Sequence, residues 1–169
     1  MEIVNSTIND LDLIFSFYEE ATLFQKMQFH RTWQPFNRDM VTREINENKQ
    51  FKIVSDGNII GIFAIAYNDA LIWKEKDLEP SIYLHRIVSH EDAKGKFLVK
   101  KIIDWALDHA KKLNLKFIRL DTFSDNKKLV DYYISCRFKL VGETTPEKSK
   151  DLPDHYAGVS LALLEIEVK

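Results

Sequence analysis

Residues 84–101 read LHRIVSHEDAKGKFLVKK, and this stretch decides the fold. Leu, Ile and Val in its first six residues indicate a buried strand, and from residue 97 apolar side chains recur at helical spacing. Gly95 lies in the turn between them. A helix start offers free backbone N–H groups and a positive dipole end, and Lys94, Lys96, Lys100 and Lys101 add cations. The stretch predicts a polyanion site, with a solvated lysine-rich helix face as the alternative.

Strands and helices alternate on both sides of this junction. Apolar and β-branched runs predict strands over residues 51–54, 59–67, 82–89, 117–120, 138–141 and 156–168. Helical spacing predicts helices from a capping box at Thr7 and Asp10 to residue 29, from 37 to 46, from 97 to 113, and from a cap at Asp125-Asn126 to 135. The stretch through Trp73 and Pro80 and the segment 143–154 read as loops. The pattern predicts an α/β protein, with helices on the faces of a mixed sheet.

Composition excludes several classes of protein. The 169 residues, 45% hydrophobic and 30% charged, predict one globular domain over residues 1–169. The five glycines do not match the spacing of a dinucleotide-binding turn or a P-loop. A net charge of −2 gives no pull toward nucleic acid, and no apolar stretch is long enough to span a membrane. With the single Cys136 and no signal-peptide pattern at the N-terminus, we expect a cytoplasmic protein that binds neither nucleic acid nor membrane.

Residues 82–142 resemble the GNAT (GCN5-related) family of acyl-CoA N-acyltransferases. The family's strand, Arg/Gln-x-x-Gly-x-Gly/Ala turn and helix match residues 87–89, 94–99 and the helix that ends near 113. The next family strand matches 117–121, and the Asn-x-x-Ala-x-x-Leu-Tyr helix with its following Gly-Phe matches 126–133 and 137–138. The rest of the chain agrees in the order of its elements. The resemblance implies a central, mixed and mostly antiparallel β-sheet flanked by helices on both faces.

Three features depart from the family pattern. Lys94 replaces the Arg/Gln, Phe97 and Val99 replace small residues, and Arg137 replaces a glycine. Phe97 is the largest change, because a big side chain at this turn narrows the space for a diphosphate unless it points away. The departures support an alternative function, a catalytically weak or inactive GNAT-fold module that binds CoA and regulates.

The resemblance implies acetyl-CoA as cosubstrate and no metal. Backbone groups of the strand, above all Ile87 and Ser89, would pair with the pantetheine arm, and Asn126 would hydrogen-bond it. The pyrophosphate would bind the N–H groups and lysines of the turn and helix start. The implied cofactor-binding residues are Ile87, Val88, Ser89, Lys94, Gly95, Lys96, Phe97, Leu98, Val99, Lys100 and Asn126.

Acetyl transfer to an amine needs a deprotonated nitrogen and a protonated leaving thiolate. The resemblance places the Tyr133 hydroxyl near the thioester sulfur as the acid, although the adjacent Tyr132 can be confused with it. His85 is the candidate base, because imidazole titrates near neutral pH. Glu75, Asp77 and a water-mediated base stay open as alternatives.

An unusual number of aromatic residues lies around the end of the first predicted helix and in the predicted loop through Trp73. Phe29, Trp33 and Trp73 are the candidate wall of an acceptor pocket, and ordinary core packing is the alternative. The resulting hypothesis is an N-acetyltransferase that moves an acetyl group from acetyl-CoA to a primary amine of a small molecule, peptide or protein. The acceptor is undetermined, and a homodimer is an option that the sequence leaves open.

Overall fold

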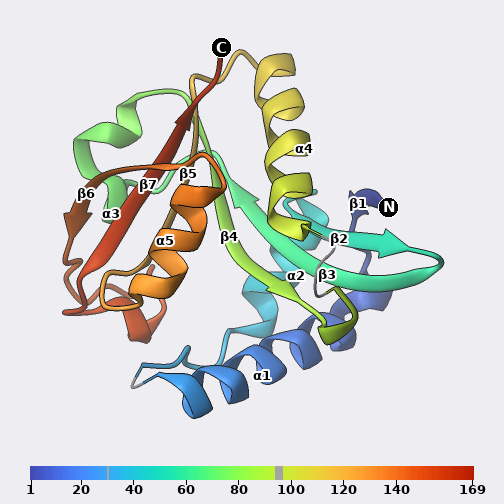
Figure 1. Cartoon of the computed structure of the whole chain (residues 1–169). Coiled ribbons are helices and arrows are strands. Elements are labelled where there is room, and N and C mark those ends of the chain that lie inside the picture. Colours follow the sequence, from blue (N-terminus) through green and yellow to red (C-terminus); the bar gives the residue numbers. More distant parts are fainter. Residues whose placement is uncertain (30, 94–96) are drawn as a thin grey trace. The chain divides into compact units, whose positions relative to one another are not determined.

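The computed structural model describes residues 1–29, 31–93 and 97–169 (Figure 1). Its helices are α1 (Leu11–Gln28), α2 (Arg38–Asn46), α3 (Ala70–Trp73), α4 (Leu98–Lys112) and α5 (Lys127–Ser135). Its 3-10 turns are η1 (Ile8–Asp10), η2 (Lys74–Leu78), η3 (Glu91–Ala93) and η4 (Asp154–Tyr156). Its strands are β1 (Glu2–Asn5), β2 (Gln50–Ser55), β3 (Asn58–Ala66), β4 (Ser81–Ser89), β5 (Phe117–Phe123), β6 (Lys139–Thr144) and β7 (Leu161–Glu167).

The strands follow the order β1-β2-β3-β4-β5-β7-β6 in a seven-stranded sheet. β4 and β5 pair in parallel, with Tyr83 opposite Arg119. The pairs β1–β2, β2–β3, β5–β7 and β6–β7 are antiparallel. This confirms the predicted mixed, mostly antiparallel sheet with helices. The chain forms two compact units, residues 1–65 with 86–102 and residues 66–85 with 103–169.

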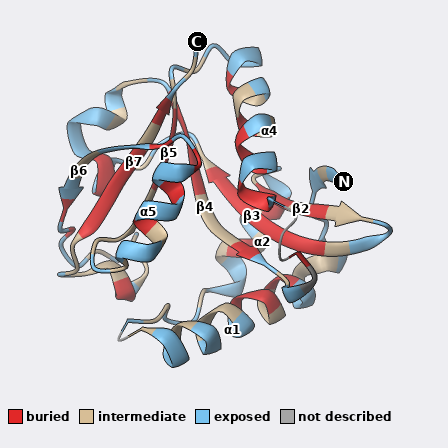
Figure 2. Cartoon of the chain, in the orientation of Figure 1, coloured by how far each residue is buried: buried red, intermediate tan, exposed pale blue. Residues whose placement is uncertain are grey.

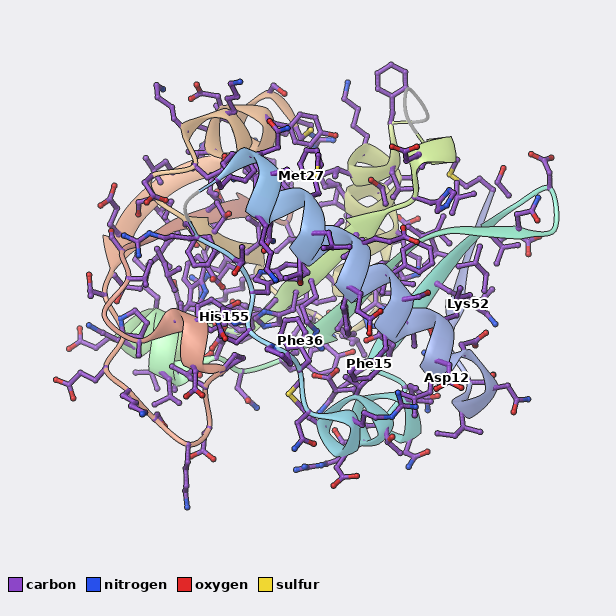
Figure 3. All side chains as sticks on the ribbon, turned by 90° about the horizontal axis from the view of Figure 1, so that it is seen from below. Asp12, Phe15, Met27, Phe36, Lys52 and His155 are labelled. Atoms are coloured by element: carbon purple, nitrogen blue, oxygen red, sulfur yellow. The ribbon has the colours of Figure 1, made fainter. Side chains whose placement is uncertain are left out.

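The first unit is built on the β2–β3 hairpin. Asp56 and Gly57 form its two-residue turn, and both have positive φ angles, 53° and 81°, as a type I′ turn requires. On one face, apolar residues of α1 and α2 pack on Ile62 and Val88, and Phe15 and Phe36 border this core (Figure 3). Gly61 admits a close neighbour, because an added Cβ there would lie 2.7 Å from the side chain of Leu98.

The second unit contains the beginning of β4 together with β5, β7 and β6. Trp73 and Ile72 of α3 pack on Tyr83, Leu161 and Leu163 in one core cluster. Alternate residues of a strand point to opposite faces, and α5, which covers the other face, buries Val130 and Tyr133 (Figure 2). None of the helices among the described residues is long and apolar enough to cross a membrane.

The predicted loop through Trp73 and Pro80 contains regular structure that the sequence patterns did not indicate. The stretch through Trp73 holds the short α3 and η2, which are too short to show helical periodicity. The last strand begins at Leu161 rather than at 156, because residues 154–156 form the turn η4. The edge strand β1 was also not predicted, since it is four residues long and mostly exposed.

Candidate active site

His85 lies in β4, in the second unit, immediately before a distortion of the strand. The next residue, Arg86, has a φ of 48°, in the left-handed region that a side chain disfavours. The His85 side chain is 19% exposed, and its Nε2 lies 3.5 Å from Oδ2 of Asp69. The predicted base is thus a partly accessible imidazole with a carboxylate beside it.

Asp69 and Asp121 complete a cluster around His85. Asp69 precedes α3, and its backbone N–H donates a 2.7 Å hydrogen bond to Oδ1 of Asp77. Asp121 belongs to β5, and one ligand atom from each of Asp69, His85 and Asp121 lies within 4.8 Å of the other two. The Oδ2 atoms of both aspartates are buried and accept no hydrogen bond within the described chain. We call these three residues the Asp–His–Asp cluster.

Both carboxyl groups favour the neutral form. Burial, followed by repulsion from Asp121 and Asp77, raises the pKa of Asp69 to about 8. Burial raises the pKa of Asp121 to about 7. The cluster therefore takes up and releases protons close to neutral pH, as a general base requires, and its oxygen and nitrogen acceptors could also bind a cation.

Tyr133, the predicted acid, lies on α5 in the same unit. The side chain is buried, its ring packs edge-on against Phe138 at 5.9 Å, and burial strongly raises the pKa of its hydroxyl. The phenol therefore stays protonated at neutral pH and can only donate its proton. Asn126 is the N-cap of α5, where its Oδ1 accepts from the N–H of Leu129 at 3.3 Å. The side-chain N–H groups of Asn126 take no part in this cap.

The other proposed bases occupy different surroundings. Glu75 is exposed in η2, and Asp77 is half-buried and accepts the backbone N–H of Asp69. Tyr132, the neighbour of Tyr133, is 43% exposed. The two acidic alternatives are thus either solvated or engaged in holding Asp69.

The predicted cofactor strand and helix start lie in the first unit. Val88 is buried, Ile87 is half-buried and Ser89 is exposed at the end of β4. Lys94, Gly95 and Lys96 lie outside the described residues.

Phe97, just before α4, is 65% exposed, with a φ of 50°. That left-handed angle explains why a small residue suits this position in the family pattern. At the helix start, Leu98 and Val99 are buried, and Nζ of Lys100 lies 5.1 Å over the Phe97 ring. The bulky side chain therefore turns outward to solvent, where it contacts a lysine.

The aromatic residues of the predicted acceptor wall divide between the units. In the first unit Phe29 is half-buried beside Phe24, and Trp33 packs on Tyr18 and Phe36. Trp73, in the second unit, is only 2% exposed. Its burial leaves no open surface for an acceptor, so its position supports the core-packing alternative.

Sequence reasoning missed Asp69 and Asp121. Asp121 follows the strand predicted over residues 117–120, although β5 continues through it to Phe123. The sequence did contain a signal for Asp121. Thr122 and Phe123, which follow it, favour strands, so Asp121 is an acidic residue inside a strand pattern. Asp69 had no such signal, since its approach to His85 depends on the course of the segment before α3.

The comparisons with known proteins agree with this architecture. Residues 12–138 match the model of the acetyltransferase (GNAT) family. A search of curated proteins finds no match. Among solved structures, a GNAT-family acetyltransferase from Listeria monocytogenes is 20% identical, with 98% of this chain and 94% of that chain covered and a TM-score of 0.77.

Two further structures were solved with ligands. The Salmonella typhimurium protein yncA, with acetyl-CoA, is 13% identical, with 100% and 94% coverage and a TM-score of 0.69. Spermidine N-acetyltransferase from Vibrio cholerae, with CoA and spermine, is 18% identical, with 99% and 95% coverage and a TM-score of 0.67. At these identities the structural likeness establishes the fold.

Proposed function

Because this chain belongs to the acetyltransferase (GNAT) family, an acetyl-CoA-dependent group of acyltransferases, we propose that it transfers acetyl to a primary amine with His85 as base. The observation that carries the proposal is the position of His85 beside Asp69, partly accessible and 3.5 Å from a carboxylate oxygen. A carboxylate beside an imidazole orients the ring and stabilises its protonated form. Acetyl-CoA supplies the activated acetyl thioester when it is bound.

The described residues divide the chemical tasks. His85 removes a proton from the acceptor nitrogen, and Tyr133, whose pKa burial raises, keeps the proton that the departing sulfur needs. Ile87 and Ser89 of β4 offer backbone groups to the pantetheine arm, and the first turn of α4 offers N–H groups to the phosphates. The outward-facing Phe97 supports this assignment, because its exposed ring does not fill the helix start.

Titration calorimetry with acetyl-CoA and with CoA tests cofactor binding. Release of free thiol, measured over a panel of amines that includes polyamines and peptides with free N-termini, tests transfer. Binding together with amine-dependent thiol release supports the enzyme. Binding of acetyl-CoA without thiol release in the presence of any amine supports the alternative, a CoA-binding regulatory module. The departures from the family pattern at Phe97 and Val99 also support that alternative. Absence of binding contradicts both.

Replacing Tyr133 by Phe removes the proposed acid with little change in packing. We expect turnover to fall about tenfold or more, with the affinity for acetyl-CoA largely retained. The matched control is Tyr132→Phe, on the exposed side of the same helix. Unchanged turnover in the Tyr133 variant rules out its role as the acid.

A further inference from the structure

Arg86 has a backbone conformation that is strained for an arginine. Its φ of 48° lies in the left-handed region, where the Cβ of a side chain crowds the neighbouring carbonyl oxygen. Such residues persist only where the surrounding contacts compensate the strain, and they gather at functional sites. The contacts of the Arg86 side chain show how the strain is compensated here.

The two helices α1 and α2 of the first unit hold the Arg86 side chain. Its Nη2 donates to Oε2 of Glu44 on α2, and its Nε donates to the hydroxyl of Tyr18 on α1 at 3.0 Å. The guanidinium carbon also lies 5.3 Å from the ring centroid of Phe36. The side chains of Arg86 and Glu44 are only 11% and 21% exposed, so salt screens this ion pair little.

The same contacts continue into the sheet. The Tyr18 hydroxyl donates to Oε1 of the buried Gln50 at 3.4 Å, and Nε2 of Gln50 donates to the carbonyl of Phe63 on β3 at 3.2 Å. The hydroxyl therefore accepts from Arg86 and donates to Gln50. A buried network whose members are satisfied favours a single arrangement. We call Arg86, Glu44, Tyr18 and Gln50 the Arg86 network.

The Arg86 network lies directly before the backbone that is proposed to bind acetyl-CoA. Just after β4, the N–H of His90 donates to the carbonyl of Ile60 on β3 at 2.9 Å. Backbone groups of successive strand residues point alternately to the two edges of a strand, so those of Ile87 and Ser89 face the edge away from β3. This segment is therefore held at its start by the network and at its end by β3.

We propose that Glu44 and Arg86 are positioning residues for acetyl-CoA, because their ion pair holds the distortion of β4 that directs the backbone groups of Ile87 and Ser89 toward the pantetheine arm. This inference rests on the proposed function and adds two residues that the family resemblance does not imply. Both act through the strand backbone. Loss of the pair should therefore weaken the binding of pantetheine and spare the binding of the nucleotide phosphates.

The distortion depends on the ion pair for a physical reason. A shielded guanidinium that loses its carboxylate moves toward water to regain hydration. The left-handed φ of Arg86 then lacks compensating contacts, and the backbone relaxes toward the extended region. Rotation about this φ turns the peptide groups that follow, so those of Ile87 and Ser89 lose their common direction.

Titration calorimetry tests the proposal with two probes, acetyl-CoA and 3′-phospho-ADP, which is the nucleotide part of CoA without pantetheine. We expect Glu44→Gln to raise the Kd for acetyl-CoA about tenfold and to leave the Kd for the nucleotide within about twofold of the wild type. Glu47→Gln removes an exposed carboxylate paired with Lys49 and is the matched control. An equal loss for both probes would indicate a general disturbance of the fold and contradict the assignment.

A second variant, Arg86→Gly, removes the side chain but not the backbone conformation, because glycine allows a positive φ without fixing it. We expect it to raise the Kd for acetyl-CoA about as much as Glu44→Gln, and the double variant to raise it no further, because both changes remove the same restraint. The double variant leaves no arginine without its carboxylate, so it decides the matter if Glu44→Gln does not fold. An unchanged Kd in Arg86→Gly, or additive losses in the double variant, would overturn the proposal.

Amide hydrogen exchange of the protein without ligand gives a readout that is independent of acetyl-CoA. In Glu44→Gln we expect exchange of the His90 N–H to accelerate about tenfold more than that of Ile102 in α4, because the end of β4 opens locally. Equal acceleration at both amides would mean that the pair only stabilises the fold as a whole, and would contradict a positioning role.

The failures of the two proposals can be told apart. If the wild type binds acetyl-CoA and Glu44→Gln binds it equally well, the positioning role is wrong while the acetyltransferase stands. If the wild type binds no acetyl-CoA but Glu44→Gln accelerates exchange at His90, the control of β4 by the Arg86 network stands and the proposed function fails.

Discussion

Two buried charged clusters lie two residues apart on the same pair of strands, and they are built in opposite ways. Tyr83 of β4 and Arg119 of β5 belong to the first, which we call the arginine cluster, and His85 and Asp121 to the second. Arg119 is fully buried, and its guanidinium contacts Glu79 at 2.6 Å, Glu165 at 2.9 Å and the carbonyl of Lys76 at 2.6 Å. Each of its nitrogens has an acceptor.

The Asp–His–Asp cluster is compensated less completely, with His85 Nε2 3.5 Å from Oδ2 of Asp69. Its carboxylates repel each other, their Oδ2 atoms have no hydrogen-bond donor among described residues, and their pKa values rise to about 8 and about 7. A buried charge that is paired on every side holds a fold together, whereas a buried charge without a partner lowers stability unless a ligand supplies one. The arginine cluster is thus satisfied within the fold, whereas the Asp–His–Asp cluster keeps two carboxyl oxygens without a hydrogen-bond donor among the described residues.

Removing the arginine should give the largest effect. Arg119→Met leaves Glu165 and the Tyr83 hydroxyl without their cation, so we expect the free energy of unfolding to fall by about 3–5 kcal/mol. Urea unfolding measures it, with the exposed Arg43→Met as control. A loss no larger than in the control would mean that the arginine cluster contributes no more than a surface charge.

Removing the imidazole should affect turnover rather than folding. We expect His85→Gln to lower the rate of acetyl transfer about 10²-fold, because it removes the proposed proton acceptor. Thiol release gives the rate, and thermal unfolding shows whether the fold is kept. His109→Gln, at a histidine that hydrogen-bonds Tyr67 at 2.7 Å outside the cluster, should leave turnover unchanged. A fully active His85 variant would return the role of base to Asp77, Glu75 or water.

Replacing a cluster carboxylate should stabilise the protein in alkaline solution. The folded-state pKa of Asp69, about 8, exceeds the ordinary value of 3.8, so between these values the folded state holds a proton that the unfolded state has lost. The stability contributed by the neutral carboxyl is therefore complete below about pH 4 and is lost as the pH rises through about 8.

Asparagine at position 69 cannot ionise. Above about pH 8 we expect Asp69→Asn to melt about 2–4 °C higher than the wild type, and the difference should disappear toward pH 4. Thermal unfolding across this range measures it. A variant that is less stable at every pH would show that Asp69 is held as a paired carboxylate, like those around Arg119.

The smallest effect is expected where charges are exposed. Lys127 and Asp131 form an i,i+4 pair at 3.0 Å on α5, with side chains 83% and 57% exposed. Asp131→Asn should cost only about 0.3–0.5 kcal/mol, and less in high salt, because water screens the pair. Urea unfolding at two salt concentrations measures it. If Asp131→Asn cost as much stability as Arg119→Met, burial would not explain why the two charge clusters differ in their effect on folding.

Local patterns predicted the elements well where they were long. The amphipathic α4 was predicted within a residue of each end, over 97–113 against the observed Leu98–Lys112. Tyr133 and Asn126 were proposed from their resemblance to a family motif, and His85 because imidazole titrates near neutral pH. All three share one unit with Asp69 and Asp121. Trp73, by contrast, was proposed for a pocket and is buried, since an aromatic side chain looks the same in a sequence whether it lines a core or a ligand.

The sequence by itself determined the alternation of strands and helices, the family, and the strand and helix start proposed for acetyl-CoA, because these depend on residues close together in the chain. Only the tertiary structure decided which acidic groups surround His85. Asp69 and Asp121 are separated from it by 16 and 36 positions, and the parallel pairing of β4 with β5 and the segment before α3 bring them together. Burial then changes their protonation, which depends on surroundings that no local pattern records.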